Sequence, residues 1–414
     1  MHAACSAADF QRKKGWKLGI YLNSRKPSGL YKSELARPFF VDKTLLLEDL
    51  FPLIEEGNNF ICITRPRRFG KTVMANMIAS YLGKGKDSRE IFDGLNISKS
   101  RCYEKYLNQQ DLISISFNEV PKNCSSYQEY IGRIQKILMD DLKRQYPDCD
   151  IDDSEAVWDV LTRIYELEDE VRFTFVFDEW DFIFHRDFVT EKDKKDYISF
   201  LSTLLKDKPY VSLVYMTGIL PIAKYSSGSE LNMFVEYTMS TQQKYGDFFG
   251  FTETEVDMLY RRYLEYTNEP AISREDLRRW YDGYHTRTGE RMYNPRSVVV
   301  ALTNNQIGSY WTSSGPYDEI FYYIRNNVDE VRDDIALMTA GEAVPANVQE
   351  YAATSTNLST RDEILSAMIV YGFLTCENGR VSIPNKELMD KFVYMLQKDS
   401  TDKKHECKVE VLRT

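Results

Sequence analysis

The sequence lacks the apolar stretches that would place it in a membrane or mark it for secretion. No apolar run approaches the roughly 18 residues that a membrane-spanning helix requires. The start of the chain, MHAACSAADFQRKKGW, has no apolar core of the length that a secretory signal needs. We therefore expect no membrane partner and a cytoplasmic location.

The chain is also poor in residues that build disulfide frameworks or zinc sites. Its seven cysteines are scattered and include no CxxC pair, which predicts free thiols in a reducing compartment. Only four histidines are present, also dispersed, so we expect no zinc site.

Basic charge is not in excess either. The 53 lysines and arginines and the 63 aspartates and glutamates give a net charge of −10, so the surface as a whole does not attract nucleic acid. DNA binding would need a local basic patch acting against that field. What is present is an ordinary globular composition over 414 residues, which is long enough for two or three domains.

Short apolar strands alternate with amphipathic helices through roughly the first 240 residues. The strand segments are near-continuous runs of Ile, Val, Phe and Leu, as in strands covered on both faces. This alternation predicts an α/β domain with a mainly parallel sheet flanked by helices, over residues 19–245. The predicted strands are 59–64, 112–117, 172–177 and 210–218, and the predicted helices are 72–82, about 126–145, about 154–167 and about 191–207.

After about residue 245 the sequence becomes mostly helical. Thr252-x-x-Glu255 is a capping box that opens one helix, and Ser273 opens another in the same way. The later stretch PYDEIFYYIRNNVDEVRDDIALM indicates further helix. We predict a helical lid domain over 246–345.

Residues 346–400 carry a separate pattern of helix, hairpin and helix. The two short predicted strands flank Asn378-Gly379, a strong cue for a type I′ turn. At this size the pattern indicates a winged-helix-like module, and a small interaction or lid domain is an equally good interpretation because the stretch is not markedly basic. Residues 1–18 are expected to be a disordered extension, and 401–414 a C-terminal tail.

The segment ITRPRRFGKTVMA, residues 63–75, lies between the first predicted strand and a helix. A phosphate-binding loop needs that context, with backbone N–H groups turned inward at a helix N-terminus. Here Gly70 permits close backbone approach, Lys71 supplies a cation for phosphate, and Thr72 supplies a hydroxyl for magnesium. The segment therefore predicts a nucleotide site for ATP and Mg²⁺.

Arg65 stands where such a loop would carry its first glycine. That glycine allows backbone angles that arginine adopts only at an energetic cost. Considered alone, the segment could also be a basic turn that contains Gly-Lys-Thr by accident.

Two acids, Asp178 and Glu179, directly follow the apolar strand in RFTFVFDEWDF. A carboxylate at the carboxyl end of a parallel strand points into the crevice where α/β sheets bind ligands. We assign Asp178 to the magnesium shell, through water or Thr72, and Glu179 to orienting or activating the attacking water. The alternative is that these acids follow the strand simply because loops are exposed to solvent.

The next strand ends in VYMTGILPI, which places Thr217 at a tip that would neighbour both motifs. Thr217 is predicted either to contact the γ-phosphate or its water, or to cap a turn. An arginine finger can raise turnover by about 10³–10⁵. The candidates for this role are Arg186, Arg67 and Arg68.

Several segments together resemble the bacterial AAA-ATPase-like family, which lies close to STAND-type and archaeal ATPases of the P-loop class. The resemblance is collinear from about Gly19 to about Met389, and the RPRRFGKT loop is itself characteristic of the family. The segments are SRKPSGLYKSELARPFFVDKT, ICITRPRRFGKT, FVFDEWD, MTGILPI, YTMSTQQKYGDFFGFTETEV, WYDGYHTRTGERMYNPRSV and VYGFLTCENGRVSIPNKEL.

The resemblance implies a P-loop NTPase sheet, with nucleotide and magnesium contacts at Lys71 and Thr72. The family segment FVDKT falls on Phe40–Thr44, so Asp42 and Lys43 are expected to hold nucleotide, with a local cap and a solvated charge pair as the alternative. Arg296 stands where an aromatic residue is expected in YNPRSV, so we assign that segment no nucleotide-sensing role. The full set expected to bind nucleotide is Asp42, Lys43, Arg67, Arg68, Phe69, Gly70, Lys71 and Thr72.

Members of the family commonly continue into a PD-(D/E)xK-type nuclease domain. Here about 15 residues follow the last predicted helix, and they contain only the common triplet Glu406-x-Lys408. We expect the nuclease to be absent or truncated.

Three functions remain open at this point. The first is an Mg²⁺-dependent ATPase whose hydrolysis moves the C-terminal domains, with Lys71, Glu179 and Thr217 as catalytic candidates. The second is a switch or interaction protein that binds ATP and turns it over slowly. DNA binding through the 360–398 module is an optional addition to either. The expected partners are ATP, a protein that the sequence does not identify and, in the third case, nucleic acid.

Overall fold

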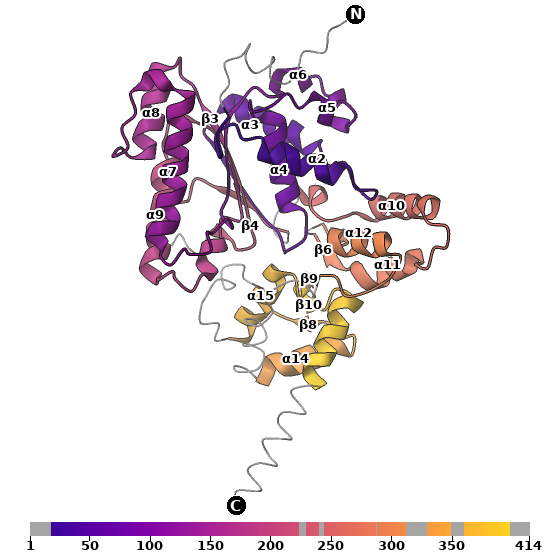
Figure 1. Cartoon of the computed structure of the whole chain (residues 1–414). Coiled ribbons are helices and arrows are strands. Elements are labelled where there is room, and N and C mark those ends of the chain that lie inside the picture. Colours follow the sequence, from indigo (N-terminus) through magenta and orange to yellow (C-terminus); the bar gives the residue numbers. More distant parts are fainter. Residues whose placement is uncertain are drawn as a thin grey trace, which may run out of the picture. The chain divides into compact units, whose positions relative to one another are not determined.

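The computed structural model describes residues 18–222, 229–239, 244–286, 288–311, 329–348 and 360–397 (Figure 1). The predicted extension before residue 18, the predicted tail and most of the helix expected from residue 316 lie outside these ranges. The described residues form two compact units. The first unit combines the described part of Met1–Thr64 with Gly70–Tyr237, and the second combines Arg65–Phe69 with the described part of Thr238–Thr414.

The first unit is built on a five-stranded sheet in which every neighbouring pair is parallel. The strand order is β2-β3-β4-β1-β5, so β4 separates β1 from β3. This confirms the predicted parallel α/β sheet, with one short edge strand that the sequence did not indicate. The strands are β1 (Asn59–Thr64), β2 (Asp111–Ser116), β3 (Phe173–Asp178), β4 (Val211–Gly218) and β5 (Val235–Tyr237).

Helices flank this sheet, and the four that the sequence predicted are present within three residues of the expected bounds. The helices before β1 and between α4 and β2 were not predicted. The α-helices of the unit are α2 (Lys26–Leu35), α3 (Leu46–Glu56), α4 (Lys71–Leu82), α5 (Arg89–Phe92), α6 (Tyr103–Tyr106), α7 (Tyr127–Gln145), α8 (Val157–Leu167) and α9 (Glu191–Leu205).

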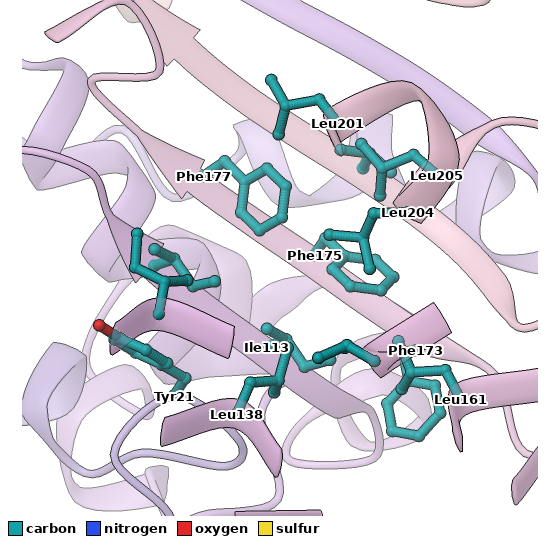
Figure 2. Close-up of a cluster of buried hydrophobic side chains, with 14 of the residues drawn as sticks. Tyr21, Ile113, Leu138, Leu161, Phe173, Phe175, Phe177, Leu201, Leu204 and Leu205 are labelled. Carbon is teal, nitrogen blue, oxygen red and sulfur yellow. The ribbon is translucent and has the colours of Figure 1, made fainter. Parts of the chain in front are cut away.

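Alternate residues of β3 build the main core on one face of the sheet. Phe173, Phe175 and Phe177 project to the same side because side chains alternate along a strand, and all three are fully buried. Figure 2 shows them against leucines of α7, α8 and α9. Burying each such ring contributes about 1.5–3 kcal/mol, so this face anchors the strand that ends in Asp178.

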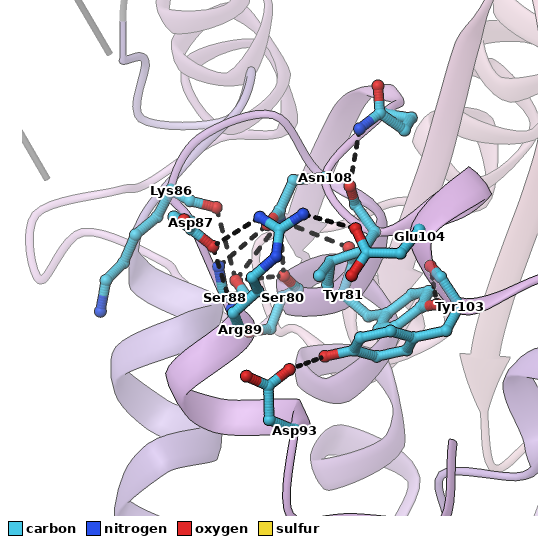
Figure 3. A network of polar contacts seen from close by, with 12 residues as sticks. Ser80, Tyr81, Lys86, Asp87, Ser88, Arg89, Asp93, Tyr103, Glu104 and Asn108 are labelled. Carbon is cyan, nitrogen blue, oxygen red and sulfur yellow. Dashed lines mark hydrogen bonds and ion pairs between the residues drawn. The ribbon is translucent and has the colours of Figure 1, made fainter. Parts of the chain in front are cut away.

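Asn108 closes the C-terminal end of α4 through a buried polar network (Figure 3). Its amide nitrogen donates to the carbonyl oxygens of Gly83, at 2.8 Å, and Ser80, at 3.2 Å, while its oxygen accepts from the Ser88 N–H at 2.9 Å. These bonds satisfy carbonyls that a helix end leaves without partners. The other end of the same helix carries Lys71 and Thr72.

The second unit is mostly helical with small antiparallel sheets. The capping boxes predicted at Thr252 and Ser273 are both present. The helices are α10 (Glu253–Tyr266), α11 (Arg274–Tyr281), α12 (Pro295–Asn304), α14 (Asp329–Thr339), α15 (Arg361–Tyr371) and a helix over 386–397; the strands are β6 (Tyr284–His285), β7 (Arg291–Met292), β8 (Val344–Pro345), β9 (Thr375–Glu377) and β10 (Arg380–Ser382).

The predicted hairpin is formed by β9 and β10, with Glu377 paired to Arg380. Asn378 and Gly379 have φ of 51° and 75°, and a type I′ turn requires positive φ at both positions. A third strand, β8, extends this sheet. Helix, hairpin and helix thus follow one another as expected, and the winged-helix interpretation stays a prediction.

The two units differ from the predicted domain boundaries in one informative way. The α/β domain was expected to run unbroken from 19 to 245, whereas Arg65–Phe69 and the residues after Tyr237 belong to the second unit. The physical reason lies in their packing, since the buried Phe69 is part of that unit's hydrophobic core. Among the described residues, no helix combines the length and apolarity needed to cross a membrane.

A buried carboxylate ties the chain before α2 to the sheet. Asp141 of α7 accepts the backbone N–H groups of Tyr21, at 2.7 Å, and Leu22, at 3.1 Å, and it pairs with Arg144 at 2.7 Å. Leu22 forms an antiparallel bridge with Ile113 of β2. One side chain therefore fixes a segment remote in sequence beside the sheet edge.

We expect Asp141→Ala to lower the free energy of unfolding by about 1.5–3 kcal/mol, because two buried N–H groups lose a charged acceptor. Urea unfolding would measure the change. Asp140→Ala is the matched control, since Asp140 is the exposed neighbour on the same helix. Equal effects of the two substitutions would contradict the assignment.

Candidate functional site

The loop between β1 and α4 ends at the N-terminus of α4. Gly70 is the N-cap of α4, with φ of 91°, a left-handed conformation that favours glycine. Gly70 has no side chain with which to cap the first N–H groups of the helix. The N–H groups at a helix N-terminus and the positive end of the helix dipole are groups that attract phosphate.

The strained position in the loop differs from the one expected. The sequence suggested an energetic cost at Arg65, but Arg65 is absent from the residues with positive φ, and Arg68 has φ of 71°. Arg65 is instead buried, its guanidinium 5.2 Å from the centre of the Phe249 ring and its Nη2 donating to the Tyr245 carbonyl at 3.4 Å. Arg65 therefore has a packing role within the second unit.

The other predicted residues of the loop's first half differ in exposure. Phe69 is buried and its ring packs edge-on against Tyr284, with 4.9 Å between ring centres. Arg67 is half-buried and Arg68 is exposed. The Phe69 side chain thus belongs to a hydrophobic core, whereas the two arginines remain predicted nucleotide contacts.

The register of the sheet brings the second motif beside the loop. Ile63 of β1 pairs with Thr217 of β4, and Phe177 of β3 pairs with Met216. The strands β1, β4 and β3 therefore end at the same edge. Thr217 is fully buried, and its hydroxyl donates to Asp178 Oδ1 at 2.6 Å. The structure thus places the Thr217 hydroxyl on the Asp178 carboxylate.

Asp178 is buried beside a hydroxyl and an ammonium group from the loop end. Burial raises the pKa of its carboxyl above the ordinary value, and hydrogen bonds from Thr217 and Thr72, with the nearby Lys71 ammonium, oppose that rise. Its Oδ2 atom is buried and has no hydrogen-bond partner in the described part of the chain that meets ordinary geometry. A buried carboxylate oxygen next to a threonine hydroxyl fits the oxygen ligands that Mg²⁺ prefers.

Glu179 lies next to this pair in an unusual backbone conformation. Its φ is 54°, which few residues other than glycine adopt and which is common at functional sites. Burial, followed by the charge of Asp178, raises the pKa of the Glu179 carboxyl, while a hydrogen bond from Asn118 and the Lys71 ammonium lower it. Lys71, Thr72, Asp178 and Glu179 therefore lie close together, and their predicted roles stay predictions.

Two further residues of the site were not predicted. Asn118 lies two residues after the end of β2, and its side chain lowers the pKa of the Glu179 carboxyl. Asp181 is buried, and its Oδ2 accepts the N–H groups of Ile219, at 2.9 Å, and Leu220, at 2.8 Å, which fixes the chain after β4. A polar residue directly after a predicted strand was the available signal for Asn118, and the third acid of FVFDEWD was the signal for Asp181.

Asp42 has local partners for both of its oxygens. Oδ1 accepts from the N–H and hydroxyl of Thr44, at 2.9 and 2.6 Å, and Oδ2 accepts from the Asn96 N–H at 2.7 Å. These bonds match the local-cap interpretation. Lys43 beside it is half-buried, and its predicted nucleotide contact stays a prediction.

Two further arginines that the sequence analysis discussed are Arg186 and Arg296. The Arg186 guanidinium packs over the rings of Phe182, at 5.2 Å, and Phe188, at 5.9 Å. Arg296 is exposed in the first turn of α12. The contacts of Arg186 do not identify it as an arginine finger.

Comparison with known proteins agrees with the site's sequence pattern. A family model described as Predicted AAA-ATPase matches residues 35–227, which include the strands β1 to β4, the loop and both strand-end acids. Over these residues the chain is similar to the AAA-ATPase-like family, which the resemblance also indicated.

One curated relative is an uncharacterized protein in the vnfD 5′ region of Azotobacter chroococcum mcd 1. It is 25% identical over 282 residues, which are 67% of this chain and 51% of that protein. The chain thus spans about half the length of this relative.

Two solved structures are similar to the chain at low sequence identity. The Walker-type ATPase PABY2304 of Pyrococcus abyssi has a TM-score of 0.46 and 13% identity, over 84% of this chain and 94% of its own. The ORC2 protein of Aeropyrum pernix, solved as ADPNP–ADP complexes, has a TM-score of 0.39 and 11% identity, over 94% of this chain and 97% of its own.

Thr217→Val should destabilise the protein by about 1.5–3 kcal/mol, because Asp178 loses a hydrogen-bond donor inside the fold. Urea unfolding without nucleotide or magnesium would measure this. Thr174→Val is the control: Thr174 is equally buried on β3, and its hydroxyl donates to the neutral side-chain amide of Gln110, at 3.4 Å. Thr217→Ser keeps the hydroxyl and should destabilise the protein much less than Thr217→Val. Equal destabilisation by the two would show that the effect comes from packing.

Proposed function

We propose that this chain is a magnesium-dependent ATPase that binds ATP at the Gly70–Thr72 end of the loop. The observation that carries the proposal is the cluster at the carboxyl ends of β1, β3 and β4. It brings a helix N-terminus, the Lys71 ammonium and two carboxyls together, one of which has a buried oxygen without a partner in the described residues.

Each residue of the cluster has a distinct proposed role. The N–H groups at the start of α4 and the Lys71 ammonium bind phosphate oxygens. Thr72 and Asp178 hold the magnesium ion, and Thr217 orients Asp178. When bound, the ion neutralises charge that develops on the phosphate oxygens. Glu179 orients the attacking water and accepts its proton.

The raised pKa of Glu179 supports this assignment, because a base is more effective as its pKa approaches the working pH. The Lys71 ammonium opposes the rise in pKa of both carboxyls, because its positive charge favours their ionised forms. We further propose that the nucleotide state moves the C-terminal part of the chain, including a winged-helix-like module over 360–397.

A slowly hydrolysing switch is the second candidate, and one contact favours it. The Asn118 side chain lies beside the Glu179 carboxyl and lowers its pKa, and a hydrogen bond between the two would hold the carboxyl away from a water molecule. Nucleic-acid binding has less support, because the basic residues of the last module are engaged. Arg361 pairs with Asp334 at 2.5 Å, and Lys386 pairs with Asp390 at 2.7 Å.

Glu179→Gln should lower kcat for ATP by about 10²–10⁴-fold while leaving the affinity for ATP nearly unchanged, because the amide cannot accept the proton. Lys71→Ala should lower both affinity and turnover. Phosphate release and binding of a fluorescent ATP analogue would be measured on the same preparations. Glu166→Gln and Lys195→Ala, at exposed helical positions, are the controls.

These variants separate the two candidates. If Glu179→Gln binds and hydrolyses ATP as the unaltered protein does, the ATPase mechanism is wrong and the slow switch is favoured. If neither protein binds ATP, both candidates fail.

Chelation of magnesium with EDTA should abolish turnover, and Asp178→Asn should raise the magnesium concentration for half-maximal turnover about 10–100-fold. The reason is that the amide gives the ion or its water a neutral neighbour in place of a charged one. Asp159→Asn, at an exposed position of α8, is the control. Turnover that persists in EDTA would contradict the magnesium role.

A further inference from the structure

The first half of the phosphate loop is a structural part of the second unit. We call Arg65–Phe69 the loop arm. It follows β1 and precedes Gly70 in the chain, yet by its packing it belongs with the residues after Tyr237. The arm is therefore covalently continuous, on its C-terminal side, with Gly70, Lys71 and Thr72.

Side chains at the start of the arm are held tightly. The Arg65 side chain is 2% exposed, stacks on the Phe249 ring and donates to the Tyr245 carbonyl. A buried guanidinium without such partners would be strongly unfavourable. Pro66 lies against Gly372, where φ is +85° and a Cβ would come within 2.6 Å of Pro66 Cβ. Only glycine permits that approach.

Backbone atoms of the arm are held as well. The Arg67 carbonyl accepts the indole N–H of Trp311 at 3.1 Å, and the Phe69 carbonyl accepts the Gly250 N–H at 3.3 Å. The Phe69 ring is buried in the second unit's core. Two hydrogen bonds thus fix the backbone on either side of Arg68, whose φ of 71° turns the chain toward Gly70.

We propose that Arg65, Phe69 and Trp311 are positioning residues for nucleotide binding: the second unit sets the path of the phosphate loop through the arm. This inference rests on the proposed function and names how that site is regulated. Because coupling free energies are reciprocal, nucleotide bound at Lys71 and Thr72 must in turn alter the arm's contacts with Trp311 and Gly250. If the arm only filled space, changes at Arg65 or Trp311 would not alter nucleotide affinity, and bound nucleotide would not alter the arm's contacts.

The first test compares two tryptophans of the second unit. Trp311→Phe removes the indole donor to Arg67 and keeps an aromatic ring, and it should weaken binding of a non-hydrolysable ATP analogue with magnesium by about 5-fold or more. Trp280→Phe is the control, since the Trp280 ring contacts Tyr281 and Lys386, which lie outside the arm. It should leave the affinity within about 2-fold of the unaltered protein.

A second pair of variants guards against misfolding of the first. Arg65→Lys keeps the charge and loses the planar guanidinium that stacks on Phe249. Arg261→Lys, at an exposed position of α10, is its control. The Arg65 variant should weaken analogue binding, whereas the Arg261 variant should not.

The third readout is hydrogen exchange in the unaltered protein, which needs no variant. The analogue should change exchange in the peptide 244–251, which contains the Gly250 N–H bonded to Phe69, and the change should vanish in Lys71→Ala. If the analogue binds, exchange there is unchanged and Trp311→Phe binds normally, the positioning role is overturned while the ATP site stands. If the unaltered protein does not bind the analogue, the proposed function and this inference both fail.

Discussion

The shared register of three parallel strands is the constraint on which the candidate site depends. β4 lies between β1 and β3, and its pairing places Thr217 level with the end of β1 and beside Asp178. A slip of one residue in either pairing would turn the Thr217 side chain to the other face of the sheet. The 2.6 Å hydrogen bond between Thr217 and Asp178 is possible only in this register. The phenylalanine core on β3 supplies the packing that fixes it.

The site places the carboxyl groups of Asp178 and Glu179 in a buried environment that disfavours their ionised forms. Burial raises the pKa of both Asp178 and Glu179, so their ionised forms are unfavourable in the folded protein without compensation. Lys71 and the threonine hydroxyls supply part of that compensation. A cation and a phosphate group bound at the same edge would supply more. Such a cluster lowers the stability of the empty protein and is therefore better explained by ligand binding than by folding.

The sequence predicted the sheet well because its strands are long apolar runs and its helices carry clear caps. It also predicted the cluster of Lys71, Thr72, Asp178 and Glu179, because strand ends of one parallel sheet meet at one edge. It missed β5, a three-residue strand whose formation depends on pairing with β1 and not on local pattern. It missed the Asn118 contact for a similar reason, since one polar residue after a strand has many possible partners.

Arg65 is the instructive failure, because its role is set by residues 180 and more positions away. A phosphate loop must bend its backbone sharply, and glycine usually allows this at little conformational cost. Here the bend includes Arg68, which adopts a left-handed conformation that arginine does not favour. Such a conformation persists only where surrounding contacts impose it, and the buried Arg65 and Phe69 on either side provide those contacts. The basic half of the loop thus replaces glycine's freedom with tertiary packing, and this would make the shape of the proposed phosphate site depend on a distant part of the chain.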